Sequence, residues 1–188
     1  MPRNGDASTR DIGEFEERGT RLPFHRDDGL ARDAVNTVPD VSVIVVTHDS
    51  APVVPFSVSS ALAQTGVATE LIVVDTGSVD SSREIIVNAG GQVLEDPWKN
   101  DFAAARNVGL ERATGDWILV LDPDEMVTPA ACADIRACVE NMEAGAARVL
   151  MRNYMPHGHR RDSYLLRMFR NAPNIRFEYA IHETVARP

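Results

Sequence analysis

Short apolar runs alternate along the chain with segments whose apolar residues have helical spacing. Val41–Thr47, Leu71–Asp75 and Trp117–Leu121 are continuous runs rich in valine, isoleucine and leucine. Such runs are typical of strands covered on both faces, as in a parallel sheet. Gln92–Glu95, between two of these runs, is a further candidate strand.

Helical patterns separate these strands. Asp80 and Asp101 are expected N-caps, and glycines follow both helices that they begin. Beyond the last apolar run we expect one more helix and two more strands. The predicted helices are Phe56–Gln64, Ser81–Asn88, Asp101–Thr114 and Pro129–Glu143, and the later strands are Arg148–Tyr154 and Tyr164–Phe169.

Alternating strands and helices with short links predict an α/β fold with a mainly parallel, doubly wound sheet flanked by helices. With 188 residues, 44% of them apolar, the chain can bury one core. We expect this domain to span residues 41–188. Residues 1–40 show no sustained period, so we expect a mobile, charged leader with short helices at most, near Ile12–Arg18 or Gly29–Val35.

Charge and composition narrow the function classes. The net charge of -9 argues against nucleic-acid binding, because that binding depends on excess positive charge. No stretch approaches the roughly 20 apolar residues of a transmembrane helix, so we expect no transmembrane segment and a cytoplasmic location. Cys132 and Cys138 lie at a spacing that suggests neither a disulfide nor a metal site.

Polar residues gather where the predicted strands end. The segments 47–50, 75–78 and 122–125 read Thr-His-Asp-Ser, Asp-Thr-Gly-Ser and Asp-Pro-Asp-Glu. In an open parallel sheet, ligands bind outside these carboxyl ends. Carboxylates that meet there repel one another, and a hard cation such as Mg²⁺ or Mn²⁺ relieves that repulsion. Such a cation could bridge a diphosphate and neutralise it as it leaves.

Each of these segments also has an ordinary structural alternative. Asp122 and Asp124 could be solvated residues at a strand exit or could cap the next helix. Asp75 could form a common Asp-Gly-Ser turn. Arg106 could be a surface arginine that pairs with Glu111 on the same helix.

Four segments in order carry a family resemblance. They are Val41-Ser-Val-Ile-Val-Val-Thr47, Leu71-Ile-Val-Val-Asp-Thr-Gly-Ser-Val-Asp80, Asp101-Phe-Ala-Ala-Ala-Arg-Asn107 and Ala113-Thr-Gly-Asp-Trp-Ile-Leu-Val-Leu-Asp-Pro-Asp-Glu125. With them the chain resembles the family 2 inverting glycosyltransferases of the GT-A fold, from Val41 to about Val185. Arg167-Met-Phe-Arg-Asn171 followed by Ile181-His-Glu183 resembles a branch with a late His-Glu pair.

The resemblance implies a donor site for a nucleotide diphosphate sugar. Thr47 and Asp49 would lie beside the nucleotide, and Asp75 would contact its base. Arg106 would face the ribose or the diphosphate, and Ser78 belongs to the same substrate-binding set. The resemblance implies UDP or GDP as the nucleotide, with UDP the commoner in the family.

The metal ligands and the base follow from the same resemblance. Asp122 would reach the ribose and the metal, Asp124 would be the main ligand of Mn²⁺ or Mg²⁺, and His182 would complete the metal shell. Glu183 is the candidate base, because inversion requires a carboxylate that deprotonates the acceptor hydroxyl. Glu178 competes with it for this role.

The chain also departs from the family pattern. Thr76 replaces an acidic residue that often follows Asp75, and the first strand ends in Thr-His-Asp-Ser rather than an Asn-Glu type of ending. Family members commonly continue with acceptor-binding helices after the position of His182-Glu183, so a fragment, an excised domain and a minimal enzyme all stay open. The acceptor, whether glycan, lipid, protein or small molecule, is also open.

Three other functions are compared with this one. The first is a module of the same fold that binds a nucleotide sugar without catalysis. A haloacid-dehalogenase-like phosphatase is disfavoured, because its Asp-X-Asp pair comes early in the chain and Glu125 follows the pair here. A dinucleotide oxidoreductase is disfavoured because no Gly-X-Gly-X-X-Gly follows a predicted strand. His157 and His159 are expected to be ordinary loop residues.

Overall fold

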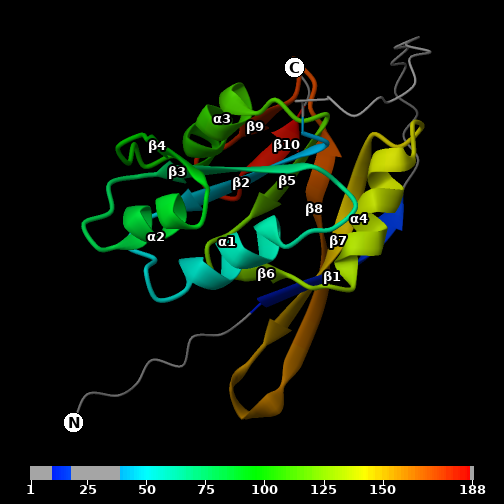
Figure 1. Ribbon diagram of the computed structural model, residues 1–188, viewed down its shortest axis with the longest axis horizontal. Helices are drawn as coiled ribbons and strands as arrows, with labels where there is room; N and C mark the ends of the chain where they lie inside the picture. The colour runs from blue at the N-terminus through cyan, green and yellow to red at the C-terminus, as the bar shows by residue number, and fades with distance from the viewer. Residues whose placement is uncertain (1–9, 18–38, 187–188) are drawn as a thin grey trace.

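The computed structural model describes residues 10–17 and 39–186 of the chain, with only the backbone described for 10–17. The described residues form an eight-stranded sheet, a two-stranded sheet and the helices around them (Figure 1). The main sheet contains β1 (Arg10–Glu17), β2 (Val41–Thr47), β3 (Thr69–Asp75), β4 (Gln92–Glu95), β5 (Trp117–Leu121), β6 (Glu125–Val127), β7 (Ala146–Tyr154) and β8 (Arg160–Arg170). The small sheet contains β9 (Arg176–Glu178) and β10 (Thr184–Ala186), and the helices are α1 (Val54–Leu62), α2 (Ser82–Asn88), α3 (Phe102–Arg112), α4 (Ala131–Glu140) and the 3₁₀ turn η1 (Pro156–Gly158).

The strand order in the main sheet is β4-β3-β2-β5-β8-β7-β1-β6. The first four strands are parallel, whereas β8 is antiparallel to both β5 and β7. Thr47 at the end of β2 is level with Asp75 at the end of β3. The predicted α/β fold with a mainly parallel central sheet is therefore confirmed, and the polar strand ends meet at one edge as the fold class requires.

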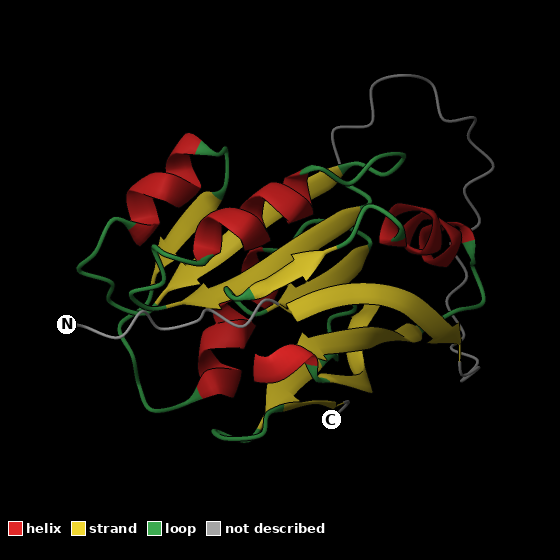
Figure 2. Ribbon diagram, turned by 90° about the horizontal axis from the view of Figure 1, so that it is seen from below, coloured by secondary structure: helices red, strands yellow, loops and turns green. Residues whose placement is uncertain are grey.

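Apolar side chains cover both faces of the parallel strands. Val43 and Val45 of β2 pack in one core with α1, α2 and α4, while Ile44 between them packs in a second core with α3 and β9. Figure 2 shows helices on both faces of the sheet. A Cβ on Gly109 of α3 would lie 2.5 Å from the Cγ2 atom of Ile44, so only glycine allows this helix to pack so closely on β2.

The predicted helix starts are confirmed in part. The carboxylate of Asp101 accepts a hydrogen bond from the backbone N–H of Ala104, 2.9 Å away, and so caps α3 as expected. Ser81 rather than Asp80 is the N-cap of α2, but Asp80 Oδ1 accepts a hydrogen bond from the backbone N–H of Ser82 at 2.9 Å. The aspartate therefore satisfies a donor of the first turn from one residue further back.

The prediction for the first 40 residues was wrong over residues 10–17. The sequence pattern predicts no strand there and at most a short helix near Ile12–Arg18, but the structure contains β1. Its backbone pairs antiparallel with β7 and parallel with β6. Tertiary pairing outweighs a weak local pattern here. The other helix considered, at Gly29–Val35, lies outside the described residues.

The β7–β8 hairpin extends well beyond the layered body of the domain (Figure 1). β5 pairs with β8 only over 168–170, so the outer part of β8 has β7 as its sole strand partner among the described residues. Among residues 10–17 and 39–186, no helix has the length and apolar character that crossing a membrane requires.

Candidate active site at the carboxyl ends of the parallel strands

A cavity of about 620 Å³ lies at the carboxyl ends of β2, β3 and β5. Six of the nine predicted site residues line this cavity: Thr47, Arg106, Asp122, Asp124, His182 and Glu183. Loops that are far apart in the sequence therefore build one chamber. Its lining consists of Val46, Thr47, His48, Ser50, Thr76, Trp98, Phe102, Arg106, Asp122, Pro123, Asp124, Ile181, His182 and Glu183.

Arg106 connects two parts of this cavity wall. Its Nη2 atom donates to Asp122 Oδ1 at 2.7 Å, and its Nε atom donates to Glu183 Oε1 at 2.7 Å. Arg106 is only 4% exposed, and its Cζ atom lies 5.6 Å from the centre of the Phe177 ring. The alternative of a surface arginine paired with Glu111 is therefore wrong.

Asn107, the next residue on α3, positions the segment that carries Glu183. Its side-chain amide donates to the backbone oxygen of Phe177 at 3.0 Å and accepts from the N–H of the same residue at 2.9 Å. This pair of hydrogen bonds fixes β9 against α3. The connection from β9 to β10 then brings Ile181, His182 and Glu183 to the cavity, with His182 in the left-handed region at φ 58°. Such a backbone is costly for a non-glycine residue, by about 1 kcal/mol or more.

A second arginine, Arg167 of β8, holds the opposite side of Asp122. Its Nη2 atom donates to Asp122 Oδ2 at 2.9 Å and to Glu125 Oε1 at 2.8 Å. Glu125 is fully buried, and its other oxygen accepts from the backbone N–H of Asp122 at 2.9 Å. Arg106, Asp122, Arg167 and Glu125 thus form one buried chain of ion pairs, which fixes the Asp122 carboxylate from both sides.

The two acids in this chain titrate in opposite directions. Burial alone would raise the pKa of Asp122, but the charges of Arg167 and Arg106 and their hydrogen bonds outweigh burial and hold this pKa well below its usual range. For Glu125, burial dominates and, although Arg167 opposes it, raises the pKa to about 7, with the negative charge of Asp122 adding to the rise. Asp122 is therefore ionised at neutral pH, while Glu125 is poised near half-protonation.

The predicted metal ligands share the cavity but do not form a preformed cage. Asp122, Asp124 and His182 all line it, yet both oxygens of Asp122 are paired with arginines. Within residues 10–17 and 39–186 no group of three or more His, Cys, Asp or Glu residues is arranged to hold a metal ion. This donor set fits a cation that takes several of its ligands from a bound diphosphate, as Mg²⁺ commonly does, rather than a site made by protein alone.

Three predicted donor-site residues organise the loops behind the cavity and do not line it. Asp75 is buried and accepts hydrogen bonds from the hydroxyl of Ser78 and from its N–H at 3.1 Å. Ser78 Oγ in turn accepts from the backbone N–H of Asp49 at 2.9 Å. The carboxylate of Asp49 accepts from the N–H of Val79 at 2.8 Å. These bonds join the loops after β2 and β3, which carry the lining residues His48, Ser50 and Thr76.

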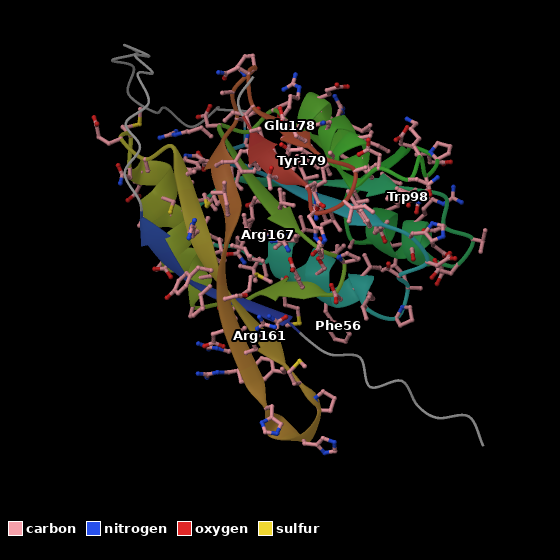
Figure 3. The ribbon with its side chains drawn as sticks, turned by 180° about the vertical axis from the view of Figure 1, so that it is seen from behind. Phe56, Trp98, Arg161, Arg167, Glu178 and Tyr179 are labelled. Carbon is pink, nitrogen blue, oxygen red and sulfur yellow. The ribbon has the colours of Figure 1, made fainter. Side chains whose placement is uncertain are left out.

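The two candidate bases occupy different places. Glu183 lines the cavity, whereas Glu178 is an exposed residue of β9 and is not part of the lining. Figure 3 shows Glu178 next to Tyr179 and apart from Arg167. Of the two candidates, Glu183 is therefore the one whose side chain faces the cavity.

The family model described as Glycosyl transferase family 2 matches residues 42–184. The chain belongs to glycosyl transferase family 2. The family resemblance drawn from the sequence motifs is thereby confirmed.

Relatives of this glycosyltransferase domain are longer proteins. Over 145 residues it is 42% identical to a TPR repeat-containing protein of Synechococcus elongatus, a match that covers 77% of this chain and 35% of that protein. Over 128 residues it is 34% identical to the succinoglycan biosynthesis protein ExoO of Rhizobium meliloti, covering 64% of this chain and 34% of that protein. The chain thus spans about a third of the length of these relatives.

The glycosyltransferase domain also resembles solved structures. The crystal structure of S. aureus TarS superposes with a TM-score of 0.51 at 25% identity, over 57% of this chain and 20% of that chain. The GT-A fold expected from the sequence is confirmed by such neighbours together with the central sheet.

Several residues of the glycosyltransferase site were not singled out from the sequence. Trp98 and Phe102 form an apolar wall, with ring centres 4.7 Å apart in an edge-to-face arrangement, although each is about 40% exposed. The sequence signal that could have identified them is their position, since two large aromatic residues lie next to the start of a predicted helix. Glu125 and Arg167 belong to the segments that carry the family resemblance, but no role was expected for either, because their burial depends on pairing across 42 residues.

Proposed function

We propose that the chain is the donor-binding and catalytic domain of a metal-dependent glycosyltransferase, which moves a sugar from a nucleotide diphosphate sugar to an acceptor hydroxyl with inversion. Two cavity-lining residues, Thr47 and Arg106, support this proposal most directly. Thr47 Oγ1 and Arg106 Nη1 are buried and have no hydrogen-bond partner among the described residues. Unpaired buried donors are costly, by about 1–3 kcal/mol each, unless a ligand satisfies them.

A diphosphate is the ligand that suits these donors in an acidic chain. Arg106 can donate to a phosphate oxygen through its remaining N–H group while its other groups hold Asp122 and Glu183. We assign Asp124 as the main protein ligand of Mn²⁺ or Mg²⁺, with His182 completing the shell and the diphosphate supplying oxygens. Asp122 is the less available ligand, because arginines pair with both of its oxygens. When bound, the cation neutralises the charge of the leaving diphosphate.

The nucleoside part of the donor fits the remaining walls. We assign the apolar wall of Trp98 and Phe102 to a ring of the donor, the base or the sugar, because aromatic faces stack on both. Thr47 offers a hydroxyl at the end of β2, while the hydroxyl of Thr76 donates to the backbone oxygen of Thr47 at 3.0 Å and can only accept a further bond. Asp75 does not line the cavity, so we propose that it acts on the nucleotide base indirectly. Its carboxylate accepts a hydrogen bond from the N–H of Ser78 and so shapes the turn beside the base. UDP is the expected nucleotide and GDP the alternative.

Transfer would proceed by a single displacement. The acceptor oxygen forms a bond with the anomeric carbon while the bond from that carbon to the diphosphate oxygen breaks, and Glu183 takes the proton of the acceptor hydroxyl. Arg106 orients the Glu183 carboxylate for this task. Because one guanidinium also holds Asp122, the donor side and the base side of the cavity are fixed to each other.

The test is a turnover assay with panels of UDP-sugars and GDP-sugars in the presence of Mn²⁺, in which free nucleotide diphosphate is measured. Glu183→Gln should lower turnover by about 100-fold or more while donor binding persists, which is the usual size of a lost general base. Glu178→Gln is the matched control, because this residue lies outside the cavity lining. Equal losses in both variants would count against the assigned base. Metal-dependent donor binding without turnover of any donor would instead indicate a nucleotide-sugar binding module without catalysis.

A further inference from the structure

The outer part of the β7–β8 hairpin, residues 154–166, is here called the arm. All of its residues except the half-buried Ser163 are exposed. The exposed side chains include large apolar ones: Tyr154 is 42%, Met155 51%, Tyr164 45% and Leu166 41% exposed. An isolated exposed leucine needs no explanation, but several large apolar residues on a projecting hairpin mark a surface that contacts something else.

Strand pairing places aromatic and basic residues on one face of this hairpin. Tyr154 pairs with Arg160, and Leu166 pairs with Arg148. Directly paired residues of two strands lie on the same face, and so do residues two apart on one strand. The face therefore carries Tyr154, Tyr164 and Leu166 together with Arg148, Arg152 and Arg160, with Asp162 as its one acid.

The hairpin carries a positive charge, whereas the chain as a whole is negatively charged. Residues 146–170 contain six arginines and a single acidic residue, Asp162, in a chain whose net charge is -9. Arg167 and Arg170 lie at the inner end of β8, where Arg167 is paired with Asp122 and Glu125, so the surplus on the outer hairpin comes from Arg148, Arg152, Arg160 and Arg161. Asp162 contacts Arg160 at 3.2 Å and Arg152 at 3.7 Å. Arg161, on the opposite face, adds a further exposed positive charge to the arm (Figure 3). The surplus of positive charge is complementary to an anionic partner.

We propose that the arm docks the domain on an anionic lipid surface. Tyrosines favour the headgroup region of a bilayer, where an apolar ring and a polar hydroxyl are both satisfied. Arginines near an anionic surface each contribute about 1 kcal/mol of attraction, and leucine and methionine side chains add apolar area that can enter the interface. The arm supplies all three kinds of side chain on a hairpin that projects from the body (Figure 1).

Pairing of the arm with the arm of a second copy is disfavoured by the same residues. The β8 edge of the arm carries Arg160 and Arg161, and two arms side by side would bring these charges together. A lipid surface with negative headgroups has no such penalty. The proposal does not depend on the donor or on catalysis. β8 nevertheless continues to Arg167, which pairs with the cavity residue Asp122, only three residues beyond Tyr164, or about 10 Å along the strand.

The test is sedimentation of the full chain with vesicles, one set of phosphatidylcholine alone and one with added phosphatidylglycerol. We expect at least 10-fold stronger binding to the anionic vesicles and loss of this binding at high salt. The double variants Arg160→Gln with Arg161→Gln, and Tyr154→Ser with Tyr164→Ser, should each weaken binding by about 10-fold. Arg112→Gln with Arg136→Gln is the matched control, because both arginines are exposed and lie outside the arm.

Several outcomes would overturn the proposal. They are equal binding to both kinds of vesicle, no binding to either, and equal losses in the arm and control variants. Complete competition by millimolar glycerol phosphate would show a site for a soluble phosphate instead of a lipid surface. Dimerisation that the arm variants abolish, measured by light scattering without vesicles, would assign the arm to a second copy. Unchanged urea unfolding of the arm variants would confirm that their loss of binding is not a loss of folding.

Discussion

Arg106 and Glu183 are 77 residues apart in the sequence, yet the Nε atom of Arg106 donates to Glu183 Oε1 at 2.7 Å. The same guanidinium donates through Nη2 to Asp122 at 2.7 Å. One nearly buried side chain thereby fixes the distance between the end of β5 and the connection that precedes β10. In the proposed reaction these are the donor side and the base side of the cavity, so Arg106 sets the geometry between them.

Arg106→Gln is predicted to damage both catalysis and folding. The variant loses two charged hydrogen bonds and leaves Asp122 with one arginine instead of two, which should lower the free energy of unfolding by about 3 kcal/mol. Turnover should fall by about 100-fold, because the carboxylate of Glu183 is no longer oriented. Urea unfolding and initial rates measure the two effects.

The control for Arg106 is Arg112→Gln, an exposed position on the same helix. It should change stability by less than about 0.5 kcal/mol. Arg106→Lys should restore the charge but not the two-sided contact, because an ammonium group lacks the planar fork. Recovery of full activity with lysine would contradict the bridging role.

Glu125 is predicted to make stability depend on pH. Its pKa is about 7 in the folded protein, mainly because of burial, against an ordinary value of 4.5. A carboxyl group that holds its proton more tightly when folded makes the protein less stable as pH rises from about 4.5 to about 7. The lowered pKa of Asp122 acts in the opposite direction, but only below its ordinary value of 3.8, outside this window.

Urea unfolding at pH 5 and at pH 7.5, with chelator present, measures this effect. The wild-type chain should lose on the order of 1–3 kcal/mol between the two values, and Glu125→Gln should lose much less. A wild-type stability that increases over this range would show that Arg167 keeps Glu125 ionised, against the direction given by burial.

Much of the fold could be predicted because its strands are buried on both faces. Val41–Thr47, Leu71–Asp75 and Trp117–Leu121 are continuous apolar runs, and each became a strand of the parallel part of the sheet. β1 was missed because Arg10–Glu17 is mostly charged, and its strand conformation comes from pairing with β6 and β7. The polar first residues of β8 were missed for the same reason, since only hairpin pairing makes Arg160–Ser163 extended.

The site residues that could be predicted are those that directly follow a predicted strand. Asp122 and Asp124 come directly after a buried strand and line the cavity. The roles of Glu125 and Arg167 could not be predicted, because a charged residue is buried only when its partner is present, and that partner comes from a distant strand. The support that Asp75 gives to its own turn also depends on geometry that sequence spacing does not fix.

Trp98→Ala is predicted to weaken nucleotide binding without unfolding the protein. Trp98 is 40% exposed and forms the apolar wall with Phe102. Loss of stacking on a base should cost about 1–3 kcal/mol, which is roughly 10- to 100-fold in affinity. Phe56→Ala is the matched control, because Phe56 is 58% exposed and lies outside the cavity lining (Figure 3). Similar nucleotide affinities for the two variants would show that the apolar wall is not part of the donor site.

Removal of residues 1–38 is predicted to lower stability even though the proposed domain begins at residue 41. The truncation deletes β1, so β6 and β7 each lose a strand partner. We expect a lower urea midpoint and a retained nucleotide site, because the cavity is built from residues 46–183. A truncated chain as stable as the full one would show that the domain is complete without β1.

The central claim is a cation-dependent site for a nucleotide diphosphate, and calorimetric titration tests it most directly. The full chain is titrated with UDP and with GDP, each with Mn²⁺ and with chelator, and the titrations are repeated with Asp124→Asn. We predict binding of one of the nucleotides, UDP first, that requires Mn²⁺ and is lost in the variant. Binding that persists with chelator and in Asp124→Asn, or no binding of either nucleotide, would contradict the proposed site.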